Sequence, residues 1–317
     1  MIGMHADMSR DFTPDFDEFR EQSPGPRESS RPSPDARRST ERTRGETPRP
    51  EARSAYVRET RPKDVPSRDS RAVLYDRYRG YDLRESEIHT LTDLGKFRVI
   101  NAGDLARHGY GGDRGRMERE TESLTRQGLV EQKRVEISLS TSTRMYTLTK
   151  AGRRLMQGSG RLPKDQEIYA GFVKPCEAKH DAELYRVYQK EEERIERRGG
   201  RVRRVLLDFE LKKKVNRDLT RLGPKKDDPD KKHDVAERHG LRVVHTRIPV
   251  PDLQIEYETP GQSIARVNLE LTTADYRPGQ LADKARAGFT LYSHGDDASH
   301  ARRLLSDREL TAEILSL

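Results

Sequence analysis

The residues best suited to chemistry are two carboxylates at the ends of two consecutive predicted strands. Asp252 opens a strand that alternates in hydrophobicity as far as Tyr257, and Glu270 comes near the end of the next strand, 265–271. A Pro260-Gly261 turn between them predicts that the two strands pair, which can bring Asp252 and Glu270 together. Converging carboxylates are suited to a hard cation such as Mg²⁺, which takes oxygen ligands.

The composition limits how much of the chain can form a packed core. Of the 317 residues, 32% are hydrophobic and 37% are charged, and the mean hydropathy is −1.02. No long apolar run is present, so we expect no membrane span and a soluble, cytoplasmic protein. The single cysteine, Cys176, excludes an intramolecular disulfide and fits a reducing compartment.

Three segments are predicted along the chain. Residues 1–70 are rich in Pro, Ser and Arg and lack apolar runs, which predicts a disordered tail. Residues 71–158 and 159–317 each hold enough apolar residues for a core, and the second domain contains a charged loop near 223–232. The formal net charge is +8, and a basic folded region favours a polyanion partner, although solubility alone explains it equally well.

Residues 83–156 predict helices and strands in a specific order. In chain order these are a helix from Arg84 to about Leu94, a helix capped by Asn101, a helix from Asp113 to Gln127, strands Val130–Leu139 and Arg144–Leu148, and a helix capped by Thr149. Asn, Asp and Thr are favoured N-cap residues, and Gly128 follows the third helix as glycine often follows a helix end. In that helix, Met117, Thr121 and Leu124 share a face that we expect to be buried.

Short motifs in this region carry a resemblance to a known fold. The third-helix stretch DRGRMERE at 113–120 precedes QGLV at 127–130, the strand hairpin and YTLTKAGRRL at 146–155. This order resembles winged helix-turn-helix DNA-binding domains of the MarR and PadR types. The resemblance implies that the third helix enters the major groove of double-stranded DNA and that the hairpin lies beside it.

The positions of basic residues agree with that reading. Arginine pairs with phosphate or guanine through two hydrogen bonds at once. We therefore expect DNA contacts from seven side chains of the third helix and the hairpin: Arg114, Arg116, Arg119, Arg126, Lys133, Arg134 and Arg144. The alternative is an ordinary solvated surface or a protein-interaction module, because Glu118, Glu120 and Glu122 lie among the arginines.

The second domain predicts a central sheet flanked by helices. The elements are a helix Ala178–Arg198, a strand Arg203–Leu211, a short strand Arg242–Val244, the two strands around Pro260-Gly261 and a helix Gly279–Tyr292, with polar loop and helix over Ser293–Leu317. The Pro251-Asp252 pair and Glu270 on consecutive strands resemble the PD-D/E-x-K nuclease superfamily. Together with the upstream winged helix, HDAEL at 180–184, Lys284 and Tyr292, they resemble the replication–relaxation family of plasmids and conjugative elements.

This resemblance implies a metal-dependent phosphodiesterase site. Asp252 and Glu270 would hold Mg²⁺, with Glu183 as a candidate third carboxylate, and Lys284 would orient water or offset charge, so that Asp252, Glu270 and Lys284 are the candidate catalytic residues. The sequence departs from the pattern at Thr272, where the superfamily has lysine. The alternative is structural: Asp252 starts a strand and Glu270 pairs with a nearby arginine.

The sequence therefore predicts an α+β protein with a disordered N-terminal tail, a winged helix-turn-helix domain and a small nuclease-like α/β domain. The favoured hypothesis is a DNA-binding protein of a mobile genetic element, which assists plasmid replication, relaxation or transfer, or regulates transcription. Its expected partners are double-stranded DNA and a second copy of the chain or other mobile-element proteins, without a membrane. The alternatives are a Mg²⁺-dependent endonuclease and a MarR- or PadR-like regulator whose second domain binds a partner.

Overall fold

The structure is a computed structural model that describes residues 70–138, 141–224, 228–273, 276–307 and 310–317. Residues Tyr56–Leu317 form one compact unit, which contains all of the described segments. The predicted disordered tail, 1–70, lies outside the described residues except for Ser70. The described chain is a mixed α+β structure, as the sequence predicts.

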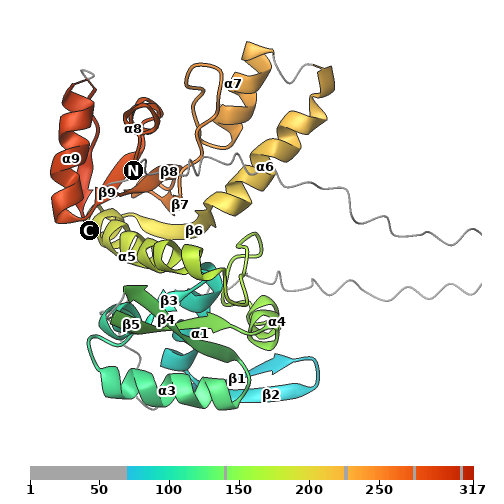
Figure 1. Ribbon diagram of the computed structural model, residues 1–317. Helices are drawn as coiled ribbons and strands as arrows, with labels where there is room; N and C mark the ends of the chain where they lie inside the picture. The colour runs from blue at the N-terminus through green and yellow to red at the C-terminus, as the bar shows by residue number, and fades with distance from the viewer. Residues whose placement is uncertain (1–69, 139–140, 225–227, 274–275, 308–309) are drawn as a thin grey trace, which may run out of the picture. The chain divides into compact units, whose positions relative to one another are not determined.

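Over the described residues, the first half of the unit contains five strands in two antiparallel sheets and a series of helices. In chain order they are β1 (Arg71–Asp76), β2 (Arg79–Arg84), α1 (Glu85–Lys96), β3 (Ile100–Asn101), α2 (Ala102–Asp104), a π-helical segment (Leu105–Gly109), α3 (Arg114–Arg126), β4 (Val130–Ser138), β5 (Thr141–Leu148) and α4 (Lys150–Gly158). β1 pairs with β2, and a separate three-stranded sheet has the order β3-β5-β4 (Figure 1).

Helix α3 forms where its local sequence predicts it. The side chain of Asp113 accepts a hydrogen bond of 2.9 Å from the backbone N–H of Arg116, which caps the helix. Met117, Thr121 and Leu124 are buried, so the predicted apolar face is confirmed. After the helix, Gly128 has a positive φ of 74°, which lets the chain turn into β4.

The β1–β2 hairpin was not predicted as a pair of strands. The sequence indicated only that a packed domain begins near the tyrosines between 75 and 81. In the structure, Leu74, Tyr81 and Leu83 face the core, whereas Tyr75 and Tyr78 are exposed. The pairing is hard to predict because Arg77, at the turn, adopts a left-handed φ of 56°, which is uncommon for a residue other than glycine.

The second half of the unit is a five-stranded mixed sheet with helices on both faces. Its elements are α5 (Pro175–Arg197), β6 (Arg201–Leu207), α6 (Asp208–Arg221), α7 (Pro229–Arg238), β7 (Leu253–Glu258), β8 (Ile264–Thr272), α8 (Pro278–Arg286), β9 (Thr290–Ser293), α9 (Gly295–Ser306) and β10 (Ile314–Ser316). The strand order is β10-β9-β8-β7-β6. Strands β6, β7 and β8 pair antiparallel, whereas β9 is parallel to both β8 and β10.

Alternation along the strands divides this half into two cores. Ile255 and Leu269 belong to the cluster that includes Tyr188 of α5, whereas Leu206 and Leu291 belong to the cluster formed with α6, α7, α8 and α9. Successive strand residues point to opposite faces, so α5 covers one face and the other helices cover the opposite face.

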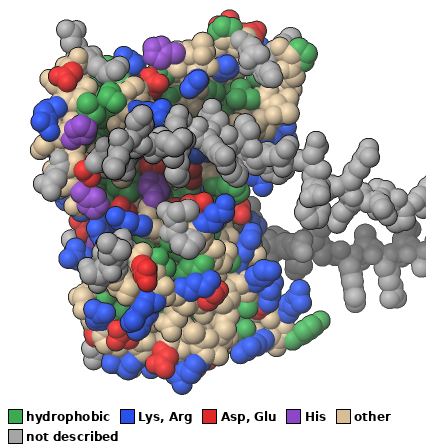
Figure 2. Space-filling model, viewed as in Figure 1, with side chains coloured by type: hydrophobic (Ala, Val, Ile, Leu, Met, Phe, Trp, Pro, Cys, Tyr) green, Lys and Arg blue, Asp and Glu red, His purple; other side chains and the backbone are tan. Residues whose placement is uncertain are grey.

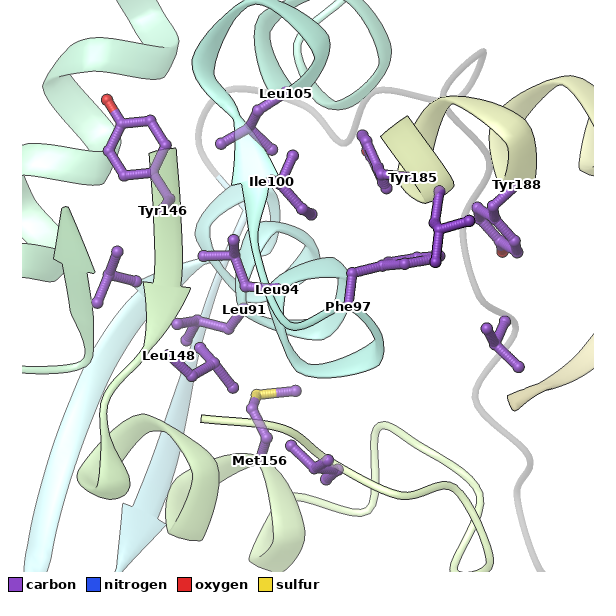
Figure 3. Close-up of a cluster of buried hydrophobic side chains, with 14 of the residues drawn as sticks. Leu91, Leu94, Phe97, Ile100, Leu105, Tyr146, Leu148, Met156, Tyr185 and Tyr188 are labelled. Carbon is purple, nitrogen blue, oxygen red and sulfur yellow. The ribbon is translucent and has the colours of Figure 1, made fainter. Parts of the chain in front are cut away.

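Helix α5 also contributes to the core of the first half. The rings of Phe97 and Tyr185 meet edge to face with centroids 5.3 Å apart, and the Phe97 ring lies 5.2 Å from that of Tyr188 (Figure 3). Such aromatic contacts add to the burial of apolar area. The buried cluster therefore continues from α1 into α5.

Several predicted elements of the second domain are wrong in extent or type. The strand predicted over Arg203–Leu211 ends at Leu207, where α6 begins, and Arg242–Val244 contributes only an isolated bridge between Val244 and Arg247. The helix predicted over 279–292 ends at Arg286, and 290–293 is the buried strand β9. β9 has only four residues, Thr-Leu-Tyr-Ser, and a segment this short does not distinguish strand from helix by periodicity, which is why β9 was missed.

The C-terminal segment and the charged loop also differ from the prediction. The segment 293–317 contains α9 and the edge strand β10, not only loop and helix. The loop predicted near 223–232 is shorter, because α7 starts at Pro229, and 225–227 lie outside the described residues. Over the described part of the chain, no helix combines the length and apolar character that crossing a membrane requires.

Candidate functional site: an arginine surface and a carboxylate cluster

The face of α3 opposite its buried side carries two arginines. Arg119 and Arg126 are exposed and lie on the outward stripe of the helix, which also contains Gly115 and Glu122. Within the described residues neither arginine forms an ion pair, so both guanidinium groups keep their hydrogen-bond donors for a ligand. Figure 2 shows Lys and Arg side chains on the viewed face where Figure 1 draws α3.

One glutamate links the start of α3 to the β4–β5 hairpin. Glu118 Oε1 lies 3.3 Å from Arg114 Nε and 3.9 Å from Arg144 Nη1. The exposed Glu118 carboxylate therefore offsets part of the charge of these two arginines. Such solvent-exposed ion pairs are weak, typically about 0–1 kcal/mol, so they do not prevent either arginine from binding phosphate.

The hairpin presents the remaining predicted basic residues. Lys133 and Arg134 are exposed on β4, and Arg144 is exposed on β5. The Lys133 ammonium lies 3.6 Å from Glu131 and 4.7 Å from the centre of the Phe172 ring, which holds it beside the strand. Arg134 pairs across the ladder with Arg144, so two cations are adjacent on one hairpin.

Arg116 does not belong to this surface. Its side chain is only 10% exposed, its Nε lies 2.9 Å from Glu120 Oε1, and its Nη2 donates to Ser86 Oγ at 2.9 Å. The expectation that Arg116 contacts DNA is corrected: Arg116 and the buried Glu120 join α3 to α1. Helical spacing alone placed Arg116 at the accessible start of α3, but packing against α1 covers it.

The β7–β8 hairpin brings the carboxylates of Asp252 and Glu270 together. The strand pairing ends with Leu253 opposite Leu269, and one residue beyond it the backbone N–H of Asp252 donates to Glu270 Oε2 at 3.2 Å. In return, Asp252 Oδ2 accepts the backbone N–H of Leu271 at 2.9 Å. These reciprocal bonds hold both carboxylates at the same end of the sheet.

Lys284 reaches the same cluster from α8. Its Nζ lies 2.6 Å from Glu270 Oε1 and donates to the carbonyl oxygen of Val250 at 2.7 Å. The hydroxyl of Tyr276 donates to the same Glu270 oxygen. Thr272, at the position where the nuclease pattern has lysine, instead donates from its buried hydroxyl to the carbonyl oxygen of Tyr292 at 3.2 Å.

His180 of α5 completes the cluster on the Asp252 side. His180 Nε2 lies 3.6 Å from Asp252 Oδ1, so a half-buried imidazole faces a mostly buried carboxylate. The HDAEL motif at 180–184 carried no predicted role for His180, and no local pattern in the sequence indicated Tyr276. Only the packing of α5 against the sheet brings His180 to the strand end.

The electrostatics of the two carboxylates differ. Burial and the neighbouring Asp252 raise the pKa of Glu270 to about 7, although Lys284 and Tyr276 act in the opposite direction. For Asp252, burial opposes ionisation, but the hydrogen bond with His180 and the His180 charge outweigh it and lower the pKa. The same hydrogen bond raises the pKa of His180 against its burial. At neutral pH the cluster therefore keeps Asp252 ionised and Glu270 near its point of half-protonation.

The arrangement does not fit a Mg²⁺ ion. Each oxygen of Asp252 and Glu270 already faces a donor or His180, and the Lys284 ammonium lies beside Glu270, where it would repel a cation. Glu183, the candidate third ligand, has its Oε1 3.5 Å from His294 Nε2. Among the residues that the structure describes, no group of three or more His, Cys, Asp or Glu side chains is arranged to hold a metal ion.

Comparison of the chain with protein-family models, curated proteins and solved structures finds no match.

Proposed function

We propose that this protein binds double-stranded DNA, with α3 in the major groove and the β4–β5 hairpin against the adjacent backbone, in the manner of a winged helix. The observation that carries the proposal is the exposed stripe of α3, where Arg119 and Arg126 lie opposite the buried face and have no acidic partner among the described residues. A groove-reading helix must bury one side and offer the other to DNA.

The spacing of these arginines supports the proposal. Seven residues of α-helix separate Arg119 from Arg126, which corresponds to about 10 Å along the helix axis. That distance matches roughly three base-pair steps of DNA at about 3.4 Å each. The order of elements around α3 and the antiparallel β4–β5 hairpin agree with the winged-helix arrangement.

We further propose that the protein acts in the cytoplasm in plasmid replication, relaxation or transfer, or in transcriptional control on a mobile element. This step rests on the sequence resemblance described above. A second copy of the chain or another mobile-element protein would be the protein partner.

A salt titration of DNA affinity tests the central proposal. The double variant Arg119→Ala/Arg126→Ala should bind DNA more weakly by about 1–3 kcal/mol for each base contact that it loses. The matched control, Arg302→Ala/Arg303→Ala, removes two exposed arginines from α9. Equal affinity in the two double variants, with both folded, would refute the placement of α3 in the groove.

The second candidate function is a phosphodiesterase that uses Asp252, Glu270 and Lys284. It is favoured by one observation, the 2.6 Å contact that places the Lys284 ammonium on the carboxylate pair. Because Mg²⁺ does not fit the pair as arranged, we propose binding without cleavage. Supercoiled plasmid incubated with the protein and Mg²⁺ should stay intact. Nicking that disappears in Lys284→Ala would establish the enzyme instead.

A further inference from the structure

Three arginines of α6 and α7 surround a single buried carboxylate. The side chain of Asp218 in α6 is 9% exposed. Its Oδ1 lies 3.5 Å from Arg221 Nη1 and 3.8 Å from Arg217 Nε, and its Oδ2 lies 3.5 Å from Arg238 Nη1 of α7. These four residues are called the Asp218 cluster below.

The Asp218 cluster carries an excess of positive charge. Although burial opposes ionisation of Asp218, the hydrogen bond with His239 and the charges of the nearby arginines lower its pKa, so it is ionised at neutral pH. Burial lowers the pKa of His239, which is therefore mostly neutral at pH 7. One carboxylate thus faces three permanently charged guanidinium groups.

The guanidinium groups are positioned but not saturated. The side chains of Arg217, Arg221 and Arg238 are 57%, 70% and 63% exposed. Each guanidinium has five N–H donors, and contacts of 3.5–3.8 Å to one carboxylate use few of them. Asp218 therefore gathers the three side chains at the surface and leaves most of their donors directed to solvent.

The helices that carry the cluster are packed together. Val215 of α6 and both Val235 and Ala236 of α7 are buried in one hydrophobic cluster, and Figure 1 draws the two helices side by side. The Asp218 cluster is thus held on two elements whose separation is set by core packing. Rigid placement of several cations favours binding of a fixed array of anions.

Helix α6 leads from the strand end that carries Asp252 and Glu270 to the Asp218 cluster. The backbone N–H of Asp208, the first residue of α6, donates to the carbonyl oxygen of Asp252 at 3.0 Å. Ten residues of helix lead from Asp208 to Asp218, or about 15 Å along the axis. Lys213 is exposed between them.

We propose that Arg217, Arg221 and Arg238 form a second DNA-binding site, which contacts phosphates of the duplex backbone independently of α3. Planar guanidinium groups match the geometry of phosphate oxygens, and three of them around one carboxylate leave a net positive site. The inference rests on the proposed DNA-binding function and adds a contact from the second half of the chain. The site recognises backbone and carries no base specificity.

The salt dependence of DNA affinity tests the site on the full-length protein. Each phosphate contact contributes about −0.9 to the slope of log K against log salt concentration for duplex DNA. The variant Arg217→Gln/Arg221→Gln should make that slope shallower by roughly 1–2, on every DNA sequence tested. The matched control is Arg302→Gln/Arg303→Gln on α9, which removes the same charge and should leave the slope unchanged.

The outcomes separate this inference from the function on which it rests. If the wild type fails to bind duplex DNA, the proposed function is wrong. If the wild type binds but the α6 and α9 variants have the same slope, the protein binds DNA without the Asp218 cluster and the inference is overturned. The variant Arg217→Lys/Arg221→Lys guards against misfolding: it keeps the charge and should retain most of the wild-type slope.

Discussion

The Lys284 ammonium lies 2.6 Å from Glu270 Oε1, although the two residues belong to α8 and β8. In the nuclease pattern the lysine follows the glutamate by two residues on the same strand, but this position of β8 holds Thr272. The ammonium thus reaches the carboxylate from another element. In this arrangement the Lys284 ammonium offsets the charge of the Glu270 carboxylate, as in a structural ion pair. For this reason we favour DNA binding without cleavage.

The raised pKa of Glu270 predicts a pH dependence of stability. A carboxylate whose pKa is raised on folding binds its proton more tightly in the folded state than in the unfolded state. The ordinary pKa of glutamate is 4.5 and that of Glu270 in the folded protein is about 7, so the free energy of unfolding should fall as the pH rises between these two values. The variant Glu270→Gln should lose this part of the dependence. Urea unfolding at several pH values between 4.5 and 7.5 measures it, with the exposed Glu237→Gln as a control.

Two results would contradict this prediction. One is a wild-type profile that stays flat across the range in which Glu270 loses its proton. The other is an equal change of slope in Glu270→Gln and Glu237→Gln, because that would assign the dependence to surface charge. Asp252 does not interfere in this window, since its lowered pKa moves its own titration to more acidic pH.

The pair of His180 and Asp252 predicts a change in imidazole titration. The hydrogen bond with Asp252 raises the pKa of His180, and burial acts against it. In Asp252→Asn the carboxylate charge is absent while burial remains, so the pKa of His180 should be lower than in the wild type. NMR titration of the imidazole resonances measures the shift. A His180 titration that is the same in Asp252→Asn and the wild type would show that the two side chains do not interact.

Arg116 and Arg119 are three residues apart on α3, but substitution of Arg116 should mainly reduce stability, whereas substitution of Arg119 should mainly reduce DNA affinity. Arg116→Ala leaves the buried Glu120 without its main partner and should reduce the free energy of unfolding by about 3–5 kcal/mol. Arg119→Ala changes an exposed side chain and should alter stability by no more than about 0.5 kcal/mol while weakening DNA binding. Chemical denaturation and DNA titration of both variants provide the comparison. Equal stability of the two variants would contradict the buried ion pair.

Gly152 in α4 should not tolerate a side chain. A Cβ atom added there would lie 2.2 Å from the carbonyl oxygen of Leu129, so α4 or the turn after α3 would have to move. Gly152→Ala should cost about 1–3 kcal/mol of stability, as overpacking does. Gly158→Ala is the matched control in the same helix, because its nearest neighbour would be 3.8 Å away. Thermal unfolding compares them, and a Gly152→Ala protein as stable as its Gly158→Ala control would rule out the close contact.

Local sequence patterns determined much of the first half of the protein. The Asp113 cap, the apolar positions Met117 and Leu124 and the glycine at 128 predicted α3 and its ends. These signals work because capping, periodicity and turn formation depend on residues close together in the chain. Similarly, the Pro260-Gly261 turn predicted the hairpin that brings Asp252 close to Glu270.

Only the tertiary structure decided which charged side chains meet. Arg116 looks as accessible as Arg119 by helical spacing, but α1 covers it, and the contact of Lys284 with Glu270 depends on how α8 packs against β8. The strand β9 exists because four residues can pair between β8 and β10. Burial, ion pairing and parallel strand pairing join residues that are distant in sequence, so their energies depend on packing that a local pattern does not contain.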